Sequence, residues 1–150
     1  QIILHGVSMG AATVLMASGE ELPENVKAII ADCGYTSEWD EFKCEANALH
    51  IPWFPVLNAA SVMSRLRDGY DFKQASALEK VKQSRIPTLF IHGSDDELVP
   101  YSMLDKLYSA AACEKECLTV NGAGHALSSS VEPELYWNTV ESFIDKYLEK

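Results

Sequence analysis

The chain has 150 residues, of which 47% are hydrophobic and 23% charged, a composition ordinary for one globular domain with a sizeable core. With 12 basic and 22 acidic residues its formal net charge is −10, so we expect no binding to nucleic acid or to anionic membranes. No apolar run approaches the roughly 20 residues that cross a bilayer. We therefore expect a cytoplasmic protein, unless sequence upstream carries a signal or an anchor.

The first half of the chain begins with alternating strand-like and helix-like segments. Residues 2–5 form a short β-branched run, and residues 8–18 are apolar almost all round, as in a buried helix. The apolar run at 26–33 is typical of a buried parallel strand. Because the chain opens inside an apolar run and without a starting methionine, we expect further sequence upstream.

The second half resumes the same alternation. Residues 88–92 and 116–121 are the third and fourth strand candidates. Residues 102–112 carry apolar side chains at helical spacing, and a similar stripe follows Pro133. This order predicts an α/β fold with about four parallel strands flanked by helices.

A long segment separates the second and third strand candidates. Residues 34–86 span about 50 positions, far more than an ordinary connection of this kind. They contain the aromatic, proline-punctuated sequence at 51–55 and a helical stretch around 56–66. We interpret the segment as a helical cap within a single domain, 1–150, with Trp53 and Phe54 as substrate contacts. The alternative is a surface excursion with a small core of its own.

The sequence Gly-Val-Ser-Met-Gly at 6–10 fits the pattern G-x-S-x-G between a strand and a helix. Such a turn holds its serine in a strained conformation, and the flanking glycines let neighbouring chain pass close by. Ser8 is therefore the candidate nucleophile. The backbone N–H of Met9, at the start of the helix, is the candidate oxyanion donor. A purely structural tight turn is the alternative.

A serine hydroxyl is a weak nucleophile until a base takes its proton. His125 is the candidate base, because it lies in a glycine-containing loop after the fourth strand. The other three histidines precede glycine at strand ends or lie in the presumed cap. Asp95 and Asp96 follow the third strand, and either would give the chain order serine, acid, histidine that α/β-hydrolases have.

The four cysteines give no sign of a metal site, because their spacing fits neither a zinc site nor a redox motif. Cys33 ends the second strand candidate and Cys117 lies within the fourth. We expect both to be small buried side chains.

Three motifs together resemble those of bacterial α/β-hydrolases of the esterase, lipase and acyl-peptidase superfamily. These are the serine turn at 6–10, the pattern H-G-x-x-D-x-x-V-P at 92–100, and G-x-G-H at 122–125. The resemblance places the acid at Asp96 and covers the C-terminal half of that fold. It implies a missing half that carries the second oxyanion donor. Residues 32–36 and Trp39 further resemble a group of uncharacterised, capped hydrolases from Gram-positive bacteria.

The resemblance implies an acyl-enzyme on Ser8 formed without a metal or an organic cofactor. The apolar cap favours small acyl or aryl esters as the small-molecule substrate. An acyl-peptidase or a thioesterase would use the same three residues, and a non-catalytic binding module of the same fold is a further alternative. We expect these 150 residues alone to be weakly active or inactive, and to self-associate through the exposed edge of the strand at 2–5.

Overall fold

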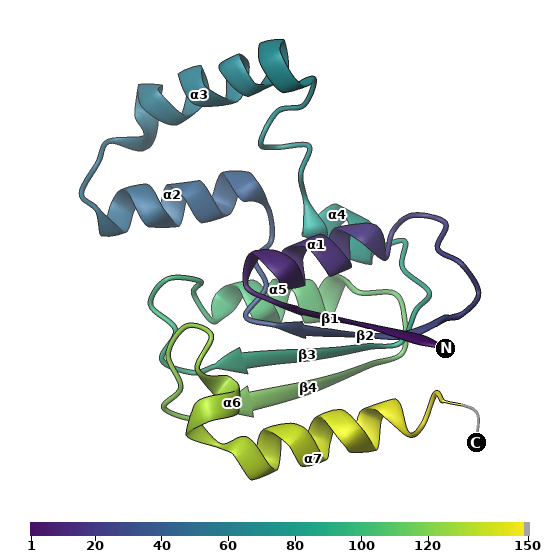
Figure 1. Ribbon diagram of the computed structural model, residues 1–150. Helices are drawn as coiled ribbons and strands as arrows, with labels where there is room; N and C mark the ends of the chain where they lie inside the picture. The colour runs from purple at the N-terminus through teal and green to yellow at the C-terminus, as the bar shows by residue number, and fades with distance from the viewer. Residues whose placement is uncertain (149–150) are drawn as a thin grey trace.

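A computed structural model describes residues 1–148 as a parallel sheet between two layers of helices (Figure 1). The strands are β1 (Ile2–Val7), β2 (Val26–Asp32), β3 (Thr88–Gly93) and β4 (Lys115–Val120). The helices are α1 (Met9–Ala17), α2 (Glu38–Ala48), α3 (Trp53–Asp68), α4 (Ala77–Val81), α5 (Ser102–Ala110), α6 (Ser128–Val131) and α7 (Pro133–Ile144). The strands pair in the order β1-β2-β3-β4, all parallel, which confirms the predicted fold class.

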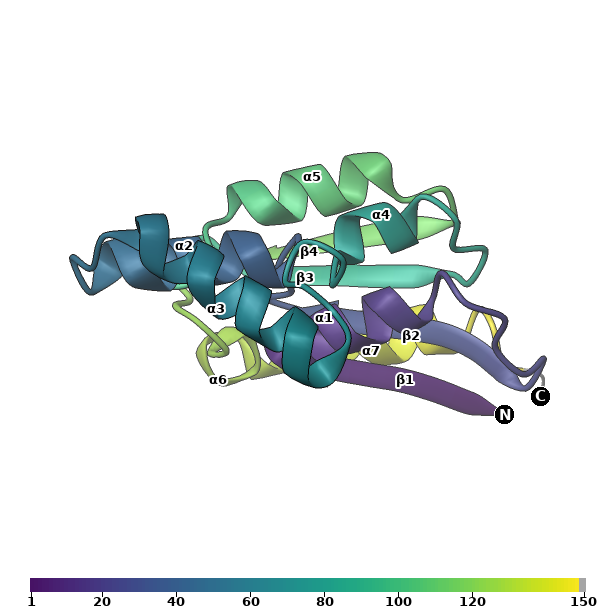
Figure 2. The same cartoon turned by 90° about the horizontal axis from the view of Figure 1, so that it is seen from above.

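The two faces of the sheet are covered by different helices, as Figures 1 and 2 show. Strand β2 explains the arrangement, because successive side chains of a strand point to opposite faces. Ile29 and Ala31 pack with α1, α4 and α5, whereas Ala28 and Ile30 pack with α7. All four side chains are at most 2% exposed. Burying each isoleucine contributes about 1.5–3 kcal/mol, and β2 is therefore the centre of the core.

The segment between β2 and β3 has two structurally different parts. Helices α2 and α3 pack against each other and stand apart from the sheet (Figure 1). Helix α4 instead returns to the helical layer, where Ala77 and Val81 are buried against α1 and α5. The segment that protrudes from the sheet is thus shorter than residues 34–86, because α4 lies within that range but packs in the core.

Helix α2 begins at a well-formed cap. The Ser37 Oγ accepts a hydrogen bond from the Asp40 N–H at 3.1 Å, which satisfies one of the free donors of the first turn. Three acidic residues, Glu38, Asp40 and Glu41, occupy that turn, where the positive end of the helix dipole favours them. Their negative charge therefore stabilises the start of the helix. Their position also places carboxylates close to the carboxyl edge of the sheet.

The two cysteine predictions have opposite outcomes. Cys33 is fully buried, as expected. The prediction for Cys117 is wrong: its side chain is exposed, because β4 lies at an edge of the sheet where the helical layers end. Within residues 1–148, no helix is both long enough and apolar enough to span a membrane.

Candidate active site

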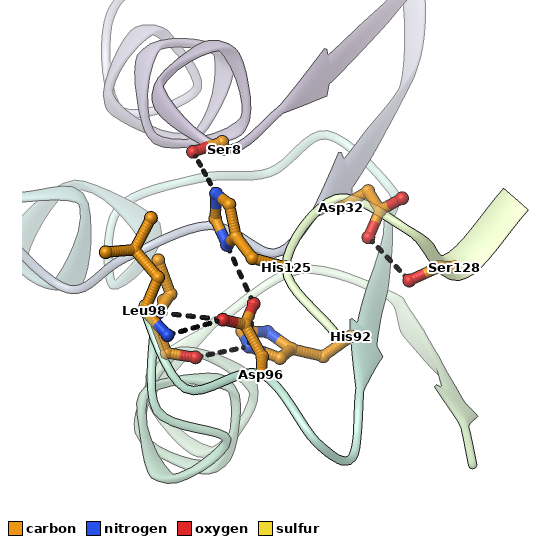
Figure 3. Close-up of polar contacts among 8 residues, drawn as sticks. Ser8, Asp32, His92, Asp96, Leu98, His125 and Ser128 are labelled. Carbon is orange, nitrogen blue, oxygen red and sulfur yellow. Dashed lines mark hydrogen bonds and ion pairs between the residues drawn. The ribbon is translucent and has the colours of Figure 1, made fainter. Parts of the chain in front are cut away.

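Three loops at the carboxyl edge of the sheet bring Ser8, Asp96 and His125 together (Figure 3). They follow β1, β3 and β4, and the carboxyl ends of parallel strands share one edge of the sheet. The Ser8 hydroxyl donates to His125 Nε2 at an Oγ–Nε2 distance of 2.8 Å. His125 Nδ1 donates to Asp96 Oδ2 at 2.9 Å. The three residues selected from the sequence thus form one continuous hydrogen-bonded chain.

The turn at Ser8 is strained. Its φ of 55° and ψ of −116° lie outside the regions that a residue with a side chain normally adopts. The Ser8 N–H donates to the Asp32 carbonyl at 2.9 Å, which ties the turn to β2. A Cβ on Gly6 would lie 2.2 Å from the Gly10 carbonyl oxygen, so the turn requires glycine there. A Cβ on Gly10 would have no atom of another part of the described chain within 4 Å. Of the two glycines that flank Ser8 in the motif, only Gly6 therefore lies too close to neighbouring backbone to carry a side chain.

Asp96 has a fully buried side chain that accepts several hydrogen bonds. Its Oδ1 accepts from the N–H groups of Leu98 and Val99 at 3.0 and 2.9 Å. Burial alone would raise the pKa of this carboxyl, but the hydrogen bonds from His92, His125 and Val99 outweigh it and hold the pKa below its ordinary value. Asp96 is therefore the ionised partner of His125.

Asp95, the other acid that the sequence offered, has a different environment. It is exposed, and its Oδ1 accepts from the Ser94 hydroxyl at 2.7 Å. The loop after β3 thus turns one aspartate inward, to His125, and its neighbour outward.

His92 is a neighbour of the site that sequence reasoning set aside. Its ring is fully buried at the end of β3, and Nε2 lies 2.9 Å from the Val99 carbonyl oxygen and 3.4 Å from Asp96 Oδ2. A carbonyl only accepts, so the Nε2 atom carries a proton and donates. Within residues 1–148 the buried Nδ1 has no hydrogen-bond partner. His92 thereby fixes the loop that holds Asp96, and the H-G-x-x-D pattern was the signal for it.

Asp32 is a second neighbour, for which the sequence analysis gave no role beyond its place in the stretch 32–36. Its side chain is 2% exposed, and Oδ1 accepts from the Ser128 hydroxyl at 3.1 Å (Figure 3). Burial raises the pKa of the Asp32 carboxyl, against the smaller opposing effects of hydrogen bonds from Ser128 and Tyr136. Through its backbone carbonyl Asp32 supports the Ser8 turn, and through its carboxyl it supports the start of α6, just after His125.

One group of side chains could be read as a metal site. Ligand atoms of Cys33, Asp96 and His125 all lie within 4.8 Å of one another. Burial, with the charge of Asp32 adding to it, raises the pKa of the Cys33 thiol to about 12, and only the thiolate is a good ligand. Asp96 and His125 already bind each other. The chemistry of this donor set fits a proton relay better than a metal ion.

A small cavity lies directly beside the nucleophile. It has a volume of about 140 Å³ and is lined by Ser8, Met9, Tyr35, Glu38, Glu41, Phe42, Glu45 and Leu98. Met9 is the first residue of α1, so its N–H belongs to the group that has no partner inside the helix. The cavity thus has the Ser8 turn on one side and one face of α2 on the other.

A larger cavity of about 340 Å³ adjoins it between α2 and α3. Its lining is mainly apolar, and Phe42 and Glu45 line both cavities. Of the two predicted substrate contacts, Trp53 lines the larger cavity, while Phe54 is 64% exposed and lies outside the lining of both.

The sequence analysis did not identify the three glutamates of the small cavity as site residues. The spacing of three and four residues between Glu38, Glu41 and Glu45 places them on one face of a helix, which is the signal that would have grouped them.

The chain is similar to known proteins in sequence and in fold. The profile of the prolyl oligopeptidase family matches residues 1–150. The uncharacterized protein YqkD of Bacillus subtilis (strain 168) is 31% identical over 143 residues, which are 95% of this chain and 47% of YqkD. The chain therefore spans about half the length of this relative.

Two solved structures are similar in fold. The esterase domain of a Rhodothermus marinus protein has a TM-score of 0.69 at 22% identity, and the match covers 97% of this chain and 60% of that one. Acylaminoacyl peptidase of Pyrococcus horikoshii has a TM-score of 0.72 at 16% identity, covering 100% of this chain and 24% of that one. At 22% and 16% identity, these two similarities are evidence for a shared fold and not for a shared activity.

Proposed function

Since this chain belongs to the prolyl oligopeptidase family and to the α/β-hydrolase superfamily, we propose that it carries the catalytic residues of a serine hydrolase that cleaves carboxylic esters. The observation that carries the proposal is the hydrogen-bonded chain from Ser8 through His125 to Asp96. The whole protein's reaction then proceeds through an acyl-enzyme on Ser8.

In the acylation step, Ser8 Oγ attacks the ester carbonyl carbon while His125 Nε2 takes the hydroxyl proton. Asp96 accepts from Nδ1, which keeps Nε2 free to receive that proton and stabilises the imidazolium that results. His125 then gives the proton to the departing alkoxide, the carbon–oxygen bond breaks, and the alcohol leaves. A water molecule repeats the sequence on the acyl-enzyme, releasing the acid and restoring Ser8.

The tetrahedral intermediate carries a negative charge on the former carbonyl oxygen. The Met9 N–H, at the positive end of α1, is the donor that we assign to it. An oxyanion hole typically uses a second donor. The family resemblance implies that this second donor lies outside these 150 residues. In other enzymes, removing one oxyanion donor lowers turnover by about 10²–10³. We therefore propose that these residues alone form a much weaker catalyst than the intact protein.

The larger cavity is a candidate binding site for the acyl group of the substrate. The cavity between α2 and α3 shares Phe42 and Glu45 with the Ser8 cavity, and Trp53 forms part of its wall. Each buried substrate methylene contributes about 0.8 kcal/mol. This lining supports the proposal that the substrates are small acyl or aryl esters and that α2 and α3 act as a cap.

An acyl-peptidase is the second candidate. The family name and the fold of the Pyrococcus horikoshii acylaminoacyl peptidase favour it, since the same three residues cleave amides as well as esters. The rate ratio for an ester and an amide with the same acyl group separates the two functions.

The decisive experiment is labelling of the intact protein with a fluorophosphonate, followed by mass spectrometry of its peptides. The expected result is a single adduct on Ser8, and loss of both labelling and ester turnover, by about 10⁶-fold, in Ser8→Ala. Ser109→Ala makes the same chemical change on the exposed face of α5 and is expected to label normally. An adduct that persists in Ser8→Ala would show that the nucleophile is elsewhere.

A further inference from the structure

The small cavity beside Ser8 has an acidic lining. Glu38, Glu41 and Glu45 on α2 all line it, across from the nucleophile. Among residues 1–148, no lysine or arginine side chain forms an ion pair with any of the three. Three carboxyl groups thus line the α2 side of one cavity, without an ion-pair partner among the described residues.

Glu41 is the member of this group that points most directly to a ligand. The residue is only 6% exposed, and its Oε2 is buried without a hydrogen-bond partner in the described part of the chain. The buried Oε2 of Glu38 lacks a partner in the same way. Burying a carboxylate without a partner generally costs several kcal/mol. A ligand that donates a hydrogen bond to this oxygen would remove that cost.

The electrostatics of the cavity agree with the geometry. Burial raises the pKa of Glu41 to about 7, and the negative charges of Glu45 and Asp96 add to that rise. Burial likewise raises the pKa of Glu38. A cation placed in the cavity would reverse these effects, because an opposite charge at 4–6 Å favours the ionised carboxylate.

We infer that the cavity beside Ser8 is a subsite for a positively charged group of the substrate, an ammonium or guanidinium on a short alkyl chain, bound by Glu41 and Glu38. The inference rests on the proposed function and narrows its substrate class.

The size and the walls of the cavity suit such a group. A volume of about 140 Å³ is the space of about four or five water molecules, which an aminoalkyl chain also fills. Tyr35 and Phe42 contribute aromatic rings to the lining, and the face of an aromatic ring attracts cations. A neutral chain would leave the carboxyl groups unsatisfied, and an anion would be repelled.

Two matched esters test the inference on the intact protein. The 4-nitrophenyl esters of Nα-acetyl-lysine and Nα-acetyl-norleucine share the leaving group and the reacting carbon, and they differ in the terminal ammonium. We expect kcat/KM to favour the lysine ester by about 10- to 100-fold, the range of a hydrogen bond to a charged group. The Nα-acetyl-glutamate ester should be the poorest of the three. The 4-nitroanilide of Nα-acetyl-lysine shows whether the cationic substrate is also accepted as an amide.

Two single-residue variants locate the effect. Glu41→Gln keeps the shape of the side chain and removes its charge, and we expect the lysine-to-norleucine ratio to fall at least about tenfold. Glu38→Gln should lower it by a smaller factor. The control is Glu24→Gln, the same change at an exposed position before β2, which should leave the ratio as in the unmodified protein.

Inhibition of the unmodified protein gives an answer that does not depend on any variant folding. Butylguanidinium should compete with the lysine ester, while butylurea, its neutral counterpart of the same shape, should not. Equal kcat/KM for the two matched esters, or equal inhibition by the two compounds, would overturn the inference.

The failure of the proposed function would look different. In that case 4-nitrophenyl acetate would show no Ser8-dependent hydrolysis at all. Ser8-dependent hydrolysis of acetate, without any preference for the cationic ester, would leave the proposed function standing and would remove the cationic subsite.

Discussion

The two sides of the candidate site differ in how completely their polar atoms are bonded. On the sheet side, Asp96 accepts from Leu98, Val99 and His125, and each partner is held by a loop anchored in the core. On the α2 side, Glu38 and Glu41 each carry a buried oxygen without a partner in the described chain.

One buried atom on the sheet side, His92 Nδ1, also has no partner in the described chain, but both oxygens of the Asp96 carboxylate are bonded. The difference is therefore between a bonded catalytic carboxylate candidate and two carboxyl groups that each keep an unpartnered oxygen. A bonded network holds its geometry before any substrate arrives, as acid–base chemistry requires. Unpartnered carboxyl groups are the expected mark of a recognition surface, because a ligand supplies what the fold does not. We therefore propose that the sheet edge carries the chemistry and that α2 and α3 set the substrate preference.

The largest expected effect is on the sheet side. Asp96→Asn should lower ester turnover by about 10⁴, because an amide on His125 Nδ1 favours the wrong tautomer. Steady-state kinetics on 4-nitrophenyl acetate measure it, with circular dichroism to verify folding.

Asp95→Asn is the matched control for this prediction. Asp95 is exposed and bonds to Ser94, so its variant should keep nearly normal turnover. If Asp95→Asn were the dead variant, the acid would be assigned to the wrong residue.

An intermediate effect is expected on the α2 side, in stability. The ordinary pKa of Glu41 is 4.5, and burial raises it to about 7 in the folded protein, with Glu45 and Asp96 adding to the shift. Between these pH values the folded state keeps a proton that the unfolded state releases, so stability falls as the pH rises and the loss is complete above pH 7.

Removing that carboxyl should therefore stabilise the protein at alkaline pH. Glu41→Gln should raise the free energy of unfolding by on the order of 1–3 kcal/mol at pH 8, and the gain should vanish near pH 4. Urea unfolding of the intact protein at the two pH values measures it, with Glu24→Gln as the control. A gain that is the same at both pH values would contradict a cost due to ionisation. The variant would then be more stable and less selective, as expected of a group retained for binding.

The smallest effect concerns the larger cavity. Trp53→Ala should move the preferred acyl chain of 4-nitrophenyl esters toward longer chains, by about fourfold in kcat/KM per methylene accommodated. Phe54→Ala, whose side chain lies outside the lining, should keep the original profile. A chain-length series from acetate to octanoate measures both. An unchanged profile for Trp53→Ala would make α2 and α3 a surface excursion instead of a cap.

The strands, and the positions of the candidate catalytic residues at one edge of the sheet, were predictable because each leaves a strong local signal. Residues 26–33 and 88–92 form apolar runs that are typical of a buried parallel strand, and Ser8 lies in a motif whose strained turn requires glycine at position 6. The motif at 92–100 was enough to select Asp96 over its neighbour.

Contacts between distant segments were not predictable in the same way. Helix α1 reads as apolar all round, but Met9 is 71% exposed while Leu15 is fully buried, since the side that faces the core is set by the sheet. The α2 helix has a mixed sequence without an apolar stripe, so it was overlooked, and its glutamates with it. Phe54 was chosen for its aromatic ring, and only the fold shows that Trp53 alone of the pair lines the cavity.

The bond between Ser8 and His125 joins residues 117 positions apart in a chain of 150 residues. Closing so long a loop costs entropy, which is recovered only when the strands between the two residues are already paired. The bond therefore forms late in folding and depends on the whole sheet. Labelling of Ser8 by a slow fluorophosphonate would then report on the global folding equilibrium, so recovery of reactivity after dilution from urea should follow the burial of Tyr35 and Tyr136 with a single rate.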